Sequence, residues 1–151
     1  MFFEGFDEFK IEVFRGITIS GVTCGNGPLL LLLHGFPQSH HIWHRVTPEL
    51  SKTYTVIAMD LRGYGASSKP KGDERHSQYA KSTMAADCTS LMSKLGHETF
   101  LLCARDKGAR VAHKLCIDYP KRVRKAIFLD IAPTLAMFTK TDQEFATAYY
   151  H

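Results

Sequence analysis

An aspartate, Asp106, lies where an apolar run at residues 99–103 gives way to apolar residues at helical spacing. The residues two positions away on each side, Ala104 and Gly108, are both small. A strand that turns sharply into a helix needs small side chains at these positions, and it presents its central residue at the end of the strand. Such a turn commonly holds that residue at a positive φ, which aspartate tolerates better than most residues. A carboxylate placed in this way is able to act as a nucleophile and to form a covalent ester.

Asp106 also has a purely structural interpretation. Aspartate is a favoured N-cap residue of helices, where its side chain accepts a hydrogen bond from a backbone N–H. The chain contains no Gly-x-Ser-x-Gly sequence, so a serine nucleophile has no candidate turn of this kind. From this segment alone, Asp106 is equally well interpreted as a nucleophile or as a helix N-cap.

Two loops that follow apolar runs carry residues able to support nucleophilic chemistry. His34-Gly-Phe-Pro-Gln38 follows the aliphatic run Leu29 to Leu33. The backbone N–H of Phe36 is predicted to form one half of an oxyanion hole, with the N–H of Lys107 as the second donor. Asp60-Leu-Arg-Gly-Tyr-Gly65 follows the next apolar run as a glycine-rich loop.

Strands and helices must position these residues, and their signals recur along the chain. Short apolar runs predict an edge hairpin and then strands covered on both faces, at residues 9–14, 17–22, 29–33, 54–59, 99–103 and 126–129. Helical spacing predicts helices over 84–95, ended by Gly96, and over 111–119, ended by Pro120. Alternating strands and helices predict an α/β fold with a mostly parallel sheet and flanking helices. In such sheets, ligands bind at the carboxyl ends of the strands, where the three loops lie.

The composition limits the class of protein. The chain has 151 residues, of which 44% are hydrophobic, enough for one globular core. The formal net charge of +4 does not indicate nucleic-acid binding, and most of the eight basic residues between Arg105 and Lys125 are expected on a solvated surface. The spacing of the four cysteines predicts neither a metal site nor a redox pair. Because the chain has no signal-peptide pattern and no long apolar run, we expect a cytoplasmic protein without a membrane segment.

The ordered set of motifs resembles the α/β-hydrolase family and, within it, the haloacetate (fluoroacetate) dehalogenases. The resemblance is carried by residues 34–38 and 60–65, by Asp106-Lys-Gly-Ala-Arg110 and by Leu129-Asp-Ile-Ala-Pro-Thr134. It implies an α/β-hydrolase core of which residues 1–135 form the amino-terminal part. Residues 136–151 would begin a lid, and a capping-box sequence at Thr141-Asp-Gln-Glu144 predicts a helix there. Family members are about twice as long, so the fold is expected to be truncated at the start of the lid.

The resemblance also implies roles for particular residues. Asp106 is the nucleophile, and Asp130 orients a catalytic histidine that family members carry near their carboxyl end and that this chain lacks. Lys107 and Arg110 stand where the family binds the substrate carboxylate with two arginines, and two cations near an anionic nucleophile suit an anionic substrate. His151 matches a halide-binding histidine. No metal and no organic cofactor is implied.

Three departures from the family pattern adjoin the nucleophile. Lys107 replaces an arginine, so the planar group that binds a carboxylate at two points is lost there. Ala104 replaces a glycine, which makes the turn more crowded. Arg105 replaces a histidine and is expected to add a third positive charge at the turn.

The leading hypothesis is a hydrolase that displaces halide from a short 2-haloacid through an ester on Asp106. Since no other histidine stands where the family has its base, we expect this chain alone to be inactive. An epoxide hydrolase is the nearest alternative. A non-catalytic fragment is the alternative of another class, because an uncovered sheet edge would favour a homodimer or association with the missing carboxyl-terminal half.

Overall fold

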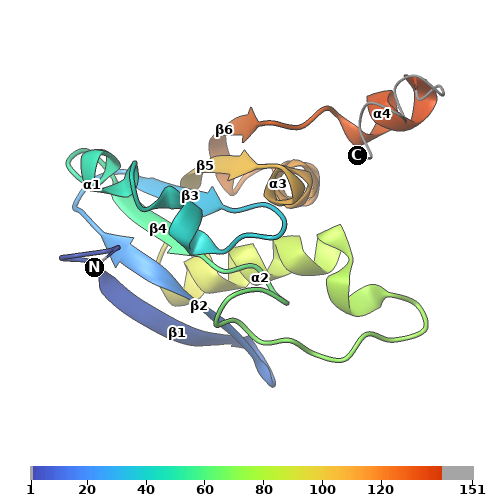
Figure 1. The fold of residues 1–151 in the computed structure, drawn as a ribbon, viewed down its shortest axis with the longest axis horizontal. Helices are drawn as coiled ribbons and strands as arrows, with labels where there is room; N and C mark the ends of the chain where they lie inside the picture. Colours follow the sequence, from blue (N-terminus) through green and yellow to red (C-terminus); the bar gives the residue numbers. More distant parts are fainter. Residues whose placement is uncertain (1, 141–151) are drawn as a thin grey trace.

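A computed structural model of the chain describes residues 2–140 (Figure 1). It begins with a hairpin in which β1 (Asp7–Phe14) pairs antiparallel with β2 (Ile17–Cys24). The two strands are joined at Arg15 and Gly16, and Gly16 has a φ of 74°, a conformation that glycine adopts without strain. The hairpin lies at one edge of the sheet, and the predicted edge hairpin is confirmed.

Four parallel strands continue the sheet beyond the hairpin, namely β3 (Leu29–Leu33), β4 (Thr55–Met59), β5 (Phe100–Arg105) and β6 (Val123–Leu129). The strand order is β1-β2-β4-β3-β5-β6. The α/β fold with a mostly parallel sheet is therefore confirmed. Because β3 lies between β4 and β5, the loops that follow these three strands meet at one end of the sheet (Figure 1).

The helical segments in chain order are η1 (His40–Trp43), α1 (Thr47–Leu50), η2 (Ser77–Tyr79), α2 (Lys81–Lys94), α3 (Lys107–Asp118) and α4 (Thr134–Lys140). The two helices predicted from apolar spacing correspond to α2 and α3. Gly96 follows α2 with a φ of 85°, as expected of a helix-ending glycine. None of the helices between residues 2 and 140 has the length and hydropathy of a membrane span.

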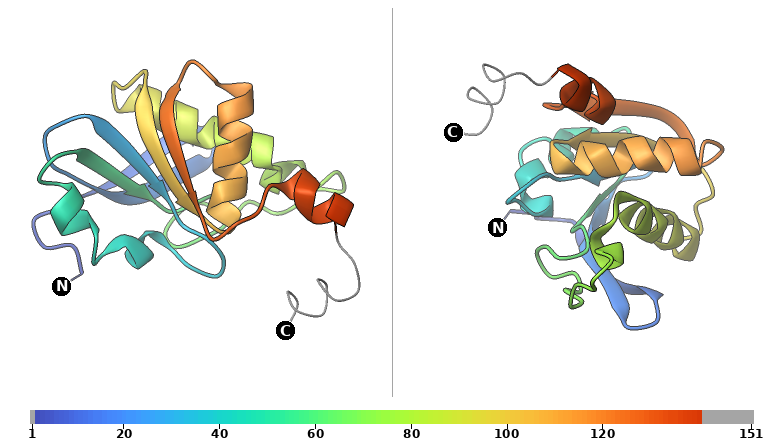
Figure 2. Two further views of the ribbon diagram at one scale, coloured as in Figure 1. Left: turned by 90° about the horizontal axis from the view of Figure 1, so that it is seen from above. Right: turned by 90° about the vertical axis from the view of Figure 1, so that its right-hand side faces the viewer.

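Both faces of the sheet are covered around β3. Helices α2 and α3 lie side by side on one face (Figure 2), where they pack on Leu31 and Leu33. Trp43 packs with Leu30 and Leu32 on the other face. Successive side chains of a strand point to opposite faces, so the unbroken leucine run of β3 contributes to both cores. This packing fixes the carboxyl end of β3, where the loop that begins at His34 starts.

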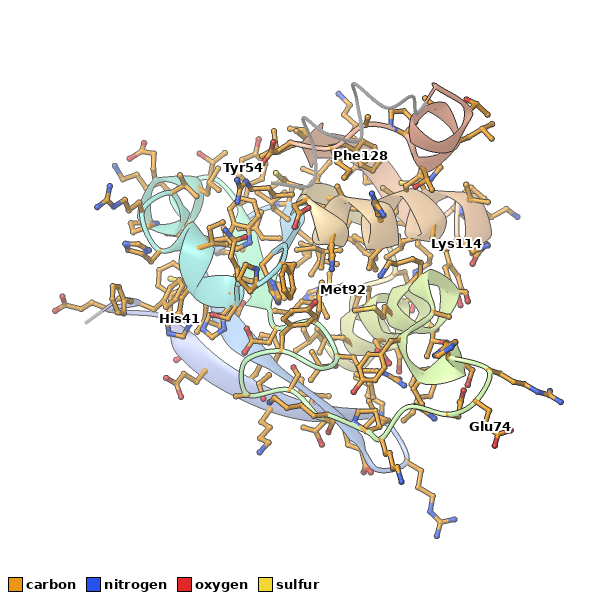
Figure 3. The ribbon with its side chains drawn as sticks, turned by 45° about the vertical axis from the view of Figure 1, so that its right-hand side comes forward. His41, Tyr54, Glu74, Met92, Lys114 and Phe128 are labelled. Carbon is orange, nitrogen blue, oxygen red and sulfur yellow. The ribbon has the colours of Figure 1, made fainter. Side chains whose placement is uncertain are left out.

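Strand β6 differs from the prediction, because the run at residues 126–129 was expected to be buried on both faces. Ile127 is 58% exposed and Phe128 is 42% exposed, whereas Met92 of α2 is fully buried. Figure 3 shows Phe128 on the outer side of the molecule and Met92 in its interior. β6 ends the strand order, so within residues 2–140 its side chains have the side chains of a neighbouring strand on one side only.

The predictions for residues 141–151, including the lid helix and the halide-binding role of His151, lie outside the described residues. The expected boundary between residues 135 and 136 falls inside α4, which begins at Thr134. That boundary stays a prediction.

Candidate active site

The turn between β5 and α3 places Asp106 at the carboxyl end of the sheet. Asp106 has a φ of 49° and a ψ of −123°, so the predicted positive φ is confirmed. Its side chain makes no capping hydrogen bond to α3, which argues against the cap interpretation. The flanking positions are tight, since Ala104 is fully buried. A Cβ added at Gly108 would overlap the carbonyl oxygen of His34 and lie 2.9 Å from that of Leu33.

The carboxylate of Asp106 is held by the loop after β3. Its Oδ2 atom accepts a hydrogen bond of 2.8 Å from the backbone N–H of Phe36. Gly35 allows this approach, because a Cβ there would lie 2.6 Å from Oδ2 of Asp106. The predicted donor and the predicted nucleophile are thus in direct contact. The N–H of Lys107 begins α3 and has no acceptor within the helix, so its position suits a second donor.

His34 belongs to the scaffold of this loop. Its Nε2 accepts the backbone N–H of Leu61 at 3.0 Å, and its Nδ1 lies 2.8 Å from the carbonyl oxygen of Gly35. This pattern requires a neutral ring with the proton on Nδ1. Burial lowers the pKa of His34, which favours the same neutral form. The ring thereby ties the loop after β3 to the loop after β4.

Asp60 is buried within the loop after β4 and accepts several of its hydrogen bonds. The buried carboxylate accepts hydrogen bonds from the backbone N–H and Nδ1 of His40, both at 2.8 Å, and from the N–H of Ala66 at 2.9 Å. Burial acts to raise its pKa, but the hydrogen bonds from His40 and Ala66 outweigh that effect and lower the pKa to about 2. Asp60 is therefore a structural carboxylate of the loop.

A buried ion pair ties the same loop to α2. Arg62 donates to both carboxylate oxygens of Asp87, at 2.8 and 2.6 Å, and its third nitrogen donates to the side chain of Gln78 at 3.0 Å. Burial raises the pKa of Asp87, while the charge and hydrogen bonds of Arg62 oppose that rise. The pair fixes the loop relative to α2, whose first residue is Lys81.

A cavity of about 440 Å³ adjoins the first turn of α3, which directly follows Asp106. Its lining residues come from the loop after β4 and from the first turns of α2 and α3; they are Gly63, Tyr64, Tyr79, Lys81, Met84, Lys107 and Arg110. The two predicted carboxylate-binding residues, Lys107 and Arg110, are both among them. Burial and the nearby charge of Asp106 raise the pKa of the Tyr64 hydroxyl.

Lys81 and Tyr64 are site residues that the motifs did not indicate. Burial and the charges of Lys107 and Arg110 lower the pKa of Lys81, which shows that the three cations are close enough to interact. The apolar spacing predicted this helix only from residue 84, so it gave no signal that Lys81 begins the helix. Tyr64 had no distinguishing signal.

The Lys107 side chain also contacts the loop after β3. Its Nζ lies 4.2 Å from the centroid of the Phe36 ring, a cation–π contact. The same residue thus lines the cavity, and its backbone N–H directly follows Asp106 in the chain. Phe36 therefore contacts both neighbours, because its N–H donates to Asp106 and its ring lies under the ammonium group of Lys107.

The residue predicted to orient a histidine, Asp130, directly follows β6. Its carboxylate forms an ion pair of 2.8 Å with Arg105, and its side chain is 66% exposed. The positive charge of Arg105, expected at the nucleophile turn, is therefore compensated by Asp130. Lys81 provides the third cation of the cavity instead. An exposed pair of this kind contributes only about 0–1 kcal/mol, so Asp130 is able to exchange partners at low cost.

No histidine within residues 2–140 has a hydrogen bond to Asp106 or Asp130. His113 packs against the Phe128 ring, with centroids 6.4 Å apart, and His41 lies beside Phe2 at 5.8 Å. In the same part of the chain, no three His, Cys, Asp or Glu side chains lie close enough to hold a metal ion. The site therefore combines a carboxylate at a turn of positive φ, a backbone N–H donor to that carboxylate and a cavity lined by cations.

The chain is similar in sequence to known hydrolases. A fluoroacetate dehalogenase from Burkholderia sp. is 48% identical over 149 residues, which are 99% of this chain and 49% of that protein. A soluble epoxide hydrolase from Corynebacterium sp. (strain C12) is 40% identical over 121 residues, 80% of this chain and 41% of that protein. The chain thus spans about half the length of the curated relatives it matches.

The solved structures agree. The crystal structure of a Nostoc sp. PCC 7120 protein described as an α/β hydrolase has a TM-score of 0.95 and 50% identity, over 100% of this chain and 51% of that one. The sequence profile of the alpha/beta hydrolase fold matches residues 28–151, which include the loops after β3, β4 and β5. The chain therefore belongs to the α/β-hydrolase fold family.

Proposed function

We propose that the chain carries the nucleophilic part of a hydrolase that removes halide from a short 2-haloacid. The observation that carries the proposal is the position of Asp106, at a strained turn with one carboxylate oxygen bound to the Phe36 N–H and a cationic cavity alongside. A relative of 48% identity is a fluoroacetate dehalogenase. Half the length of that relative is matched, so turnover by the whole protein is also part of the proposal.

In the first step, Oδ1 of Asp106, the oxygen that the Phe36 N–H does not hold, attacks the carbon that bears the halogen. A C–O bond forms while the carbon–halogen bond breaks, and the halide leaves with the bonding electron pair. The product is an ester between Asp106 and the acid. Lys107 and Arg110 border the cavity and neutralise the substrate carboxylate, which the charge of Asp106 would otherwise repel.

In the second step, water attacks the carbonyl carbon of that ester and gives up a proton to a base. The bond between this carbon and Oδ1 then breaks, and the 2-hydroxy acid leaves with Oδ1 as its hydroxyl oxygen. The negative charge develops on the oxygen held by the Phe36 N–H, and the N–H of Lys107 stabilises it as a second donor. The step requires a histidine base, for which Asp130 is the orienting acid. No histidine within the described residues forms a hydrogen bond or ion pair with either aspartate, so the chain by itself is expected to stop at the ester.

Epoxide hydrolysis is the second candidate activity, because the chain is also similar to a soluble epoxide hydrolase. Asp106 would attack an epoxide carbon in the same way. A neutral epoxide gains nothing from three cations, however, whereas a haloacid is held by them. The charge of the cavity therefore favours the haloacid.

The test is covalent capture by the 151-residue chain. Incubation with chloroacetate should add a carboxymethyl group of about 58 Da to Asp106, which peptide mass spectrometry locates. Asp106→Asn serves as the control. Chloroacetate also alkylates thiolates, but burial raises the pKa of Cys88, Cys103 and Cys116 and slows that reaction at neutral pH. Labelling of cysteines alone, with Asp106 unmodified, would refute the proposed nucleophile. Labelling by styrene oxide in place of chloroacetate would favour the epoxide hydrolase.

A second candidate function, self-association, is favoured by the exposed apolar side chains of β6. An open edge with Ile127 and Phe128 exposed favours pairing with another strand, either of a second copy or of a carboxyl-terminal half. Sedimentation of the 151-residue chain should show dimers or larger species, and Ile127→Lys should shift them towards monomer. A monomer at all concentrations would exclude the homodimer.

A further inference from the structure

The cavity beside Asp106 carries more positive charge than a monocarboxylate needs. Three cations line it, Lys81, Lys107 and Arg110, and none of its lining residues is acidic. With the single negative charge of Asp106, a net charge of about two remains to be neutralised. A haloacetate supplies one negative charge. A dianion would supply both.

Of the three cations, Lys81 is the one with no other interaction within the described residues to explain its position. Lys107 lies over the Phe36 ring, and Arg110 has a further interaction within the chain. The Lys81 side chain has no ion pair and no hydrogen bond with any residue in the described part of the chain, although it is half-buried. A half-buried ammonium group that faces two other cations is unfavourable unless an anion joins it.

The placement of Lys81 increases this charge imbalance. Lys81 is the first residue of α2, and Lys107 is the first residue of α3. Neither helix has an acidic residue in its first turn, so the partial positive charges of both helix starts add to those of the side chains. The cavity volume of about 440 Å³ lies in the usual range for small-molecule sites, and a four-carbon acid fits it.

We propose that Lys81 is a specificity-determining residue that binds a second carboxylate, so that the site takes halogenated dicarboxylic acids such as 2-halosuccinate in preference to haloacetate. The inference rests on the proposed function, because it assigns one substrate carboxylate to Lys107 and Arg110. The carbon that bears the halogen then lies next to Asp106, and the distal carboxylate reaches Lys81.

Binding of unreactive analogues tests the inference without turnover. Acetate and succinate are titrated into the 151-residue chain at low ionic strength, where charge interactions are least screened, and dissociation constants are measured by NMR. Succinate should bind at least about tenfold more tightly than acetate, the usual scale of a hydrogen bond between charged groups. Lys81→Gln should remove that difference and change acetate binding less than about threefold.

Two variants complete the design. Lys81→Arg keeps the charge and should retain most of the succinate preference. Lys94→Gln removes the same charge from the exposed end of the same helix, and it should leave both affinities unchanged. Equal binding of the two acids by the unmodified chain would overturn the inference, as would an equal loss of both affinities in Lys81→Gln. Labelling of Asp106 by chloroacetate is measured separately, so failure of the nucleophile is distinguishable from failure of Lys81.

Discussion

Gly35→Ala should displace the Asp106 carboxylate although the two residues are 71 positions apart. A Cβ at residue 35 would lie 2.6 Å from both the Cβ and the Oδ2 of Asp106, well inside the contact distance of about 3.5 Å. Gly35 is not among the residues with positive φ, so its backbone conformation suits alanine. The strain of the variant therefore comes from its contact with Asp106.

The expected cost is about 2 kcal/mol in the free energy of unfolding, the middle of the range for overpacking. Asp106→Gly removes the atoms that the new methyl group would meet. In that background, Gly35→Ala should cost less than about 0.5 kcal/mol, which gives a coupling energy of about 1.5 kcal/mol between the two positions. Gly35→Ala should also slow the labelling of Asp106 by chloroacetate, since the carboxylate loses its position against the Phe36 N–H.

Urea unfolding of the four proteins of this cycle measures the coupling. Gly72→Ala is the matched control, because a Cβ at Gly72 would have no atom within 4 Å. A cost that is equal with and without the Asp106 side chain would refute the reasoning, because the strain would then lie elsewhere in the loop. So would the absence of any cost.

Two further predictions concern the same loops. Gly108→Ala should lower the free energy of unfolding by about 3 kcal/mol in urea, because its Cβ meets the backbone carbonyls of His34 and Leu33, which cannot rotate away. A loss no larger than that of Gly72→Ala would contradict this. The pKa of Asp60 is lowered from 3.8 to about 2, so its contribution to stability is complete above the unfolded pKa and is lost as the pH falls through about 2. That contribution to the free energy of unfolding is about 2 kcal/mol. His40→Phe removes one of the hydrogen bonds that lower the pKa of Asp60, so the acid transition followed by circular dichroism should move to higher pH. An unchanged acid transition would contradict the role of His40.

The nucleophile turn could be predicted from the sequence because its requirements are local. Small residues two positions from Asp106 and the change from strand to helical spacing lie within one short segment, and the observed φ of 49° agrees with them. The hairpin and the parallel strands were predicted for the same reason. The contact between Phe36 and Asp106 required only the order of the strands in addition.

The remaining features depend on neighbours that are distant in sequence. Lys81 enters the cavity because the loop after β4 returns to the sheet end, and no motif encodes that path. The charge of Arg105 is cancelled by Asp130, which is 25 residues further along. The apolar sequence of β6 predicts burial, but burial depends on which segment covers the strand. These are the places where local pattern and observed environment diverge.

The hydrogen bond from Phe36 to Asp106 comes from the main chain, while the Phe36 side chain is 55% exposed. Saturation mutagenesis scored by labelling of Asp106 would therefore test the ring of Phe36 and its contact with Lys107 but not the donor, since every substitution except proline keeps the N–H. Position 35, which contributes no side chain, would rank as intolerant. An alanine scan would overlook the donor entirely, and replacement of the amide by an ester linkage would be needed to reveal it.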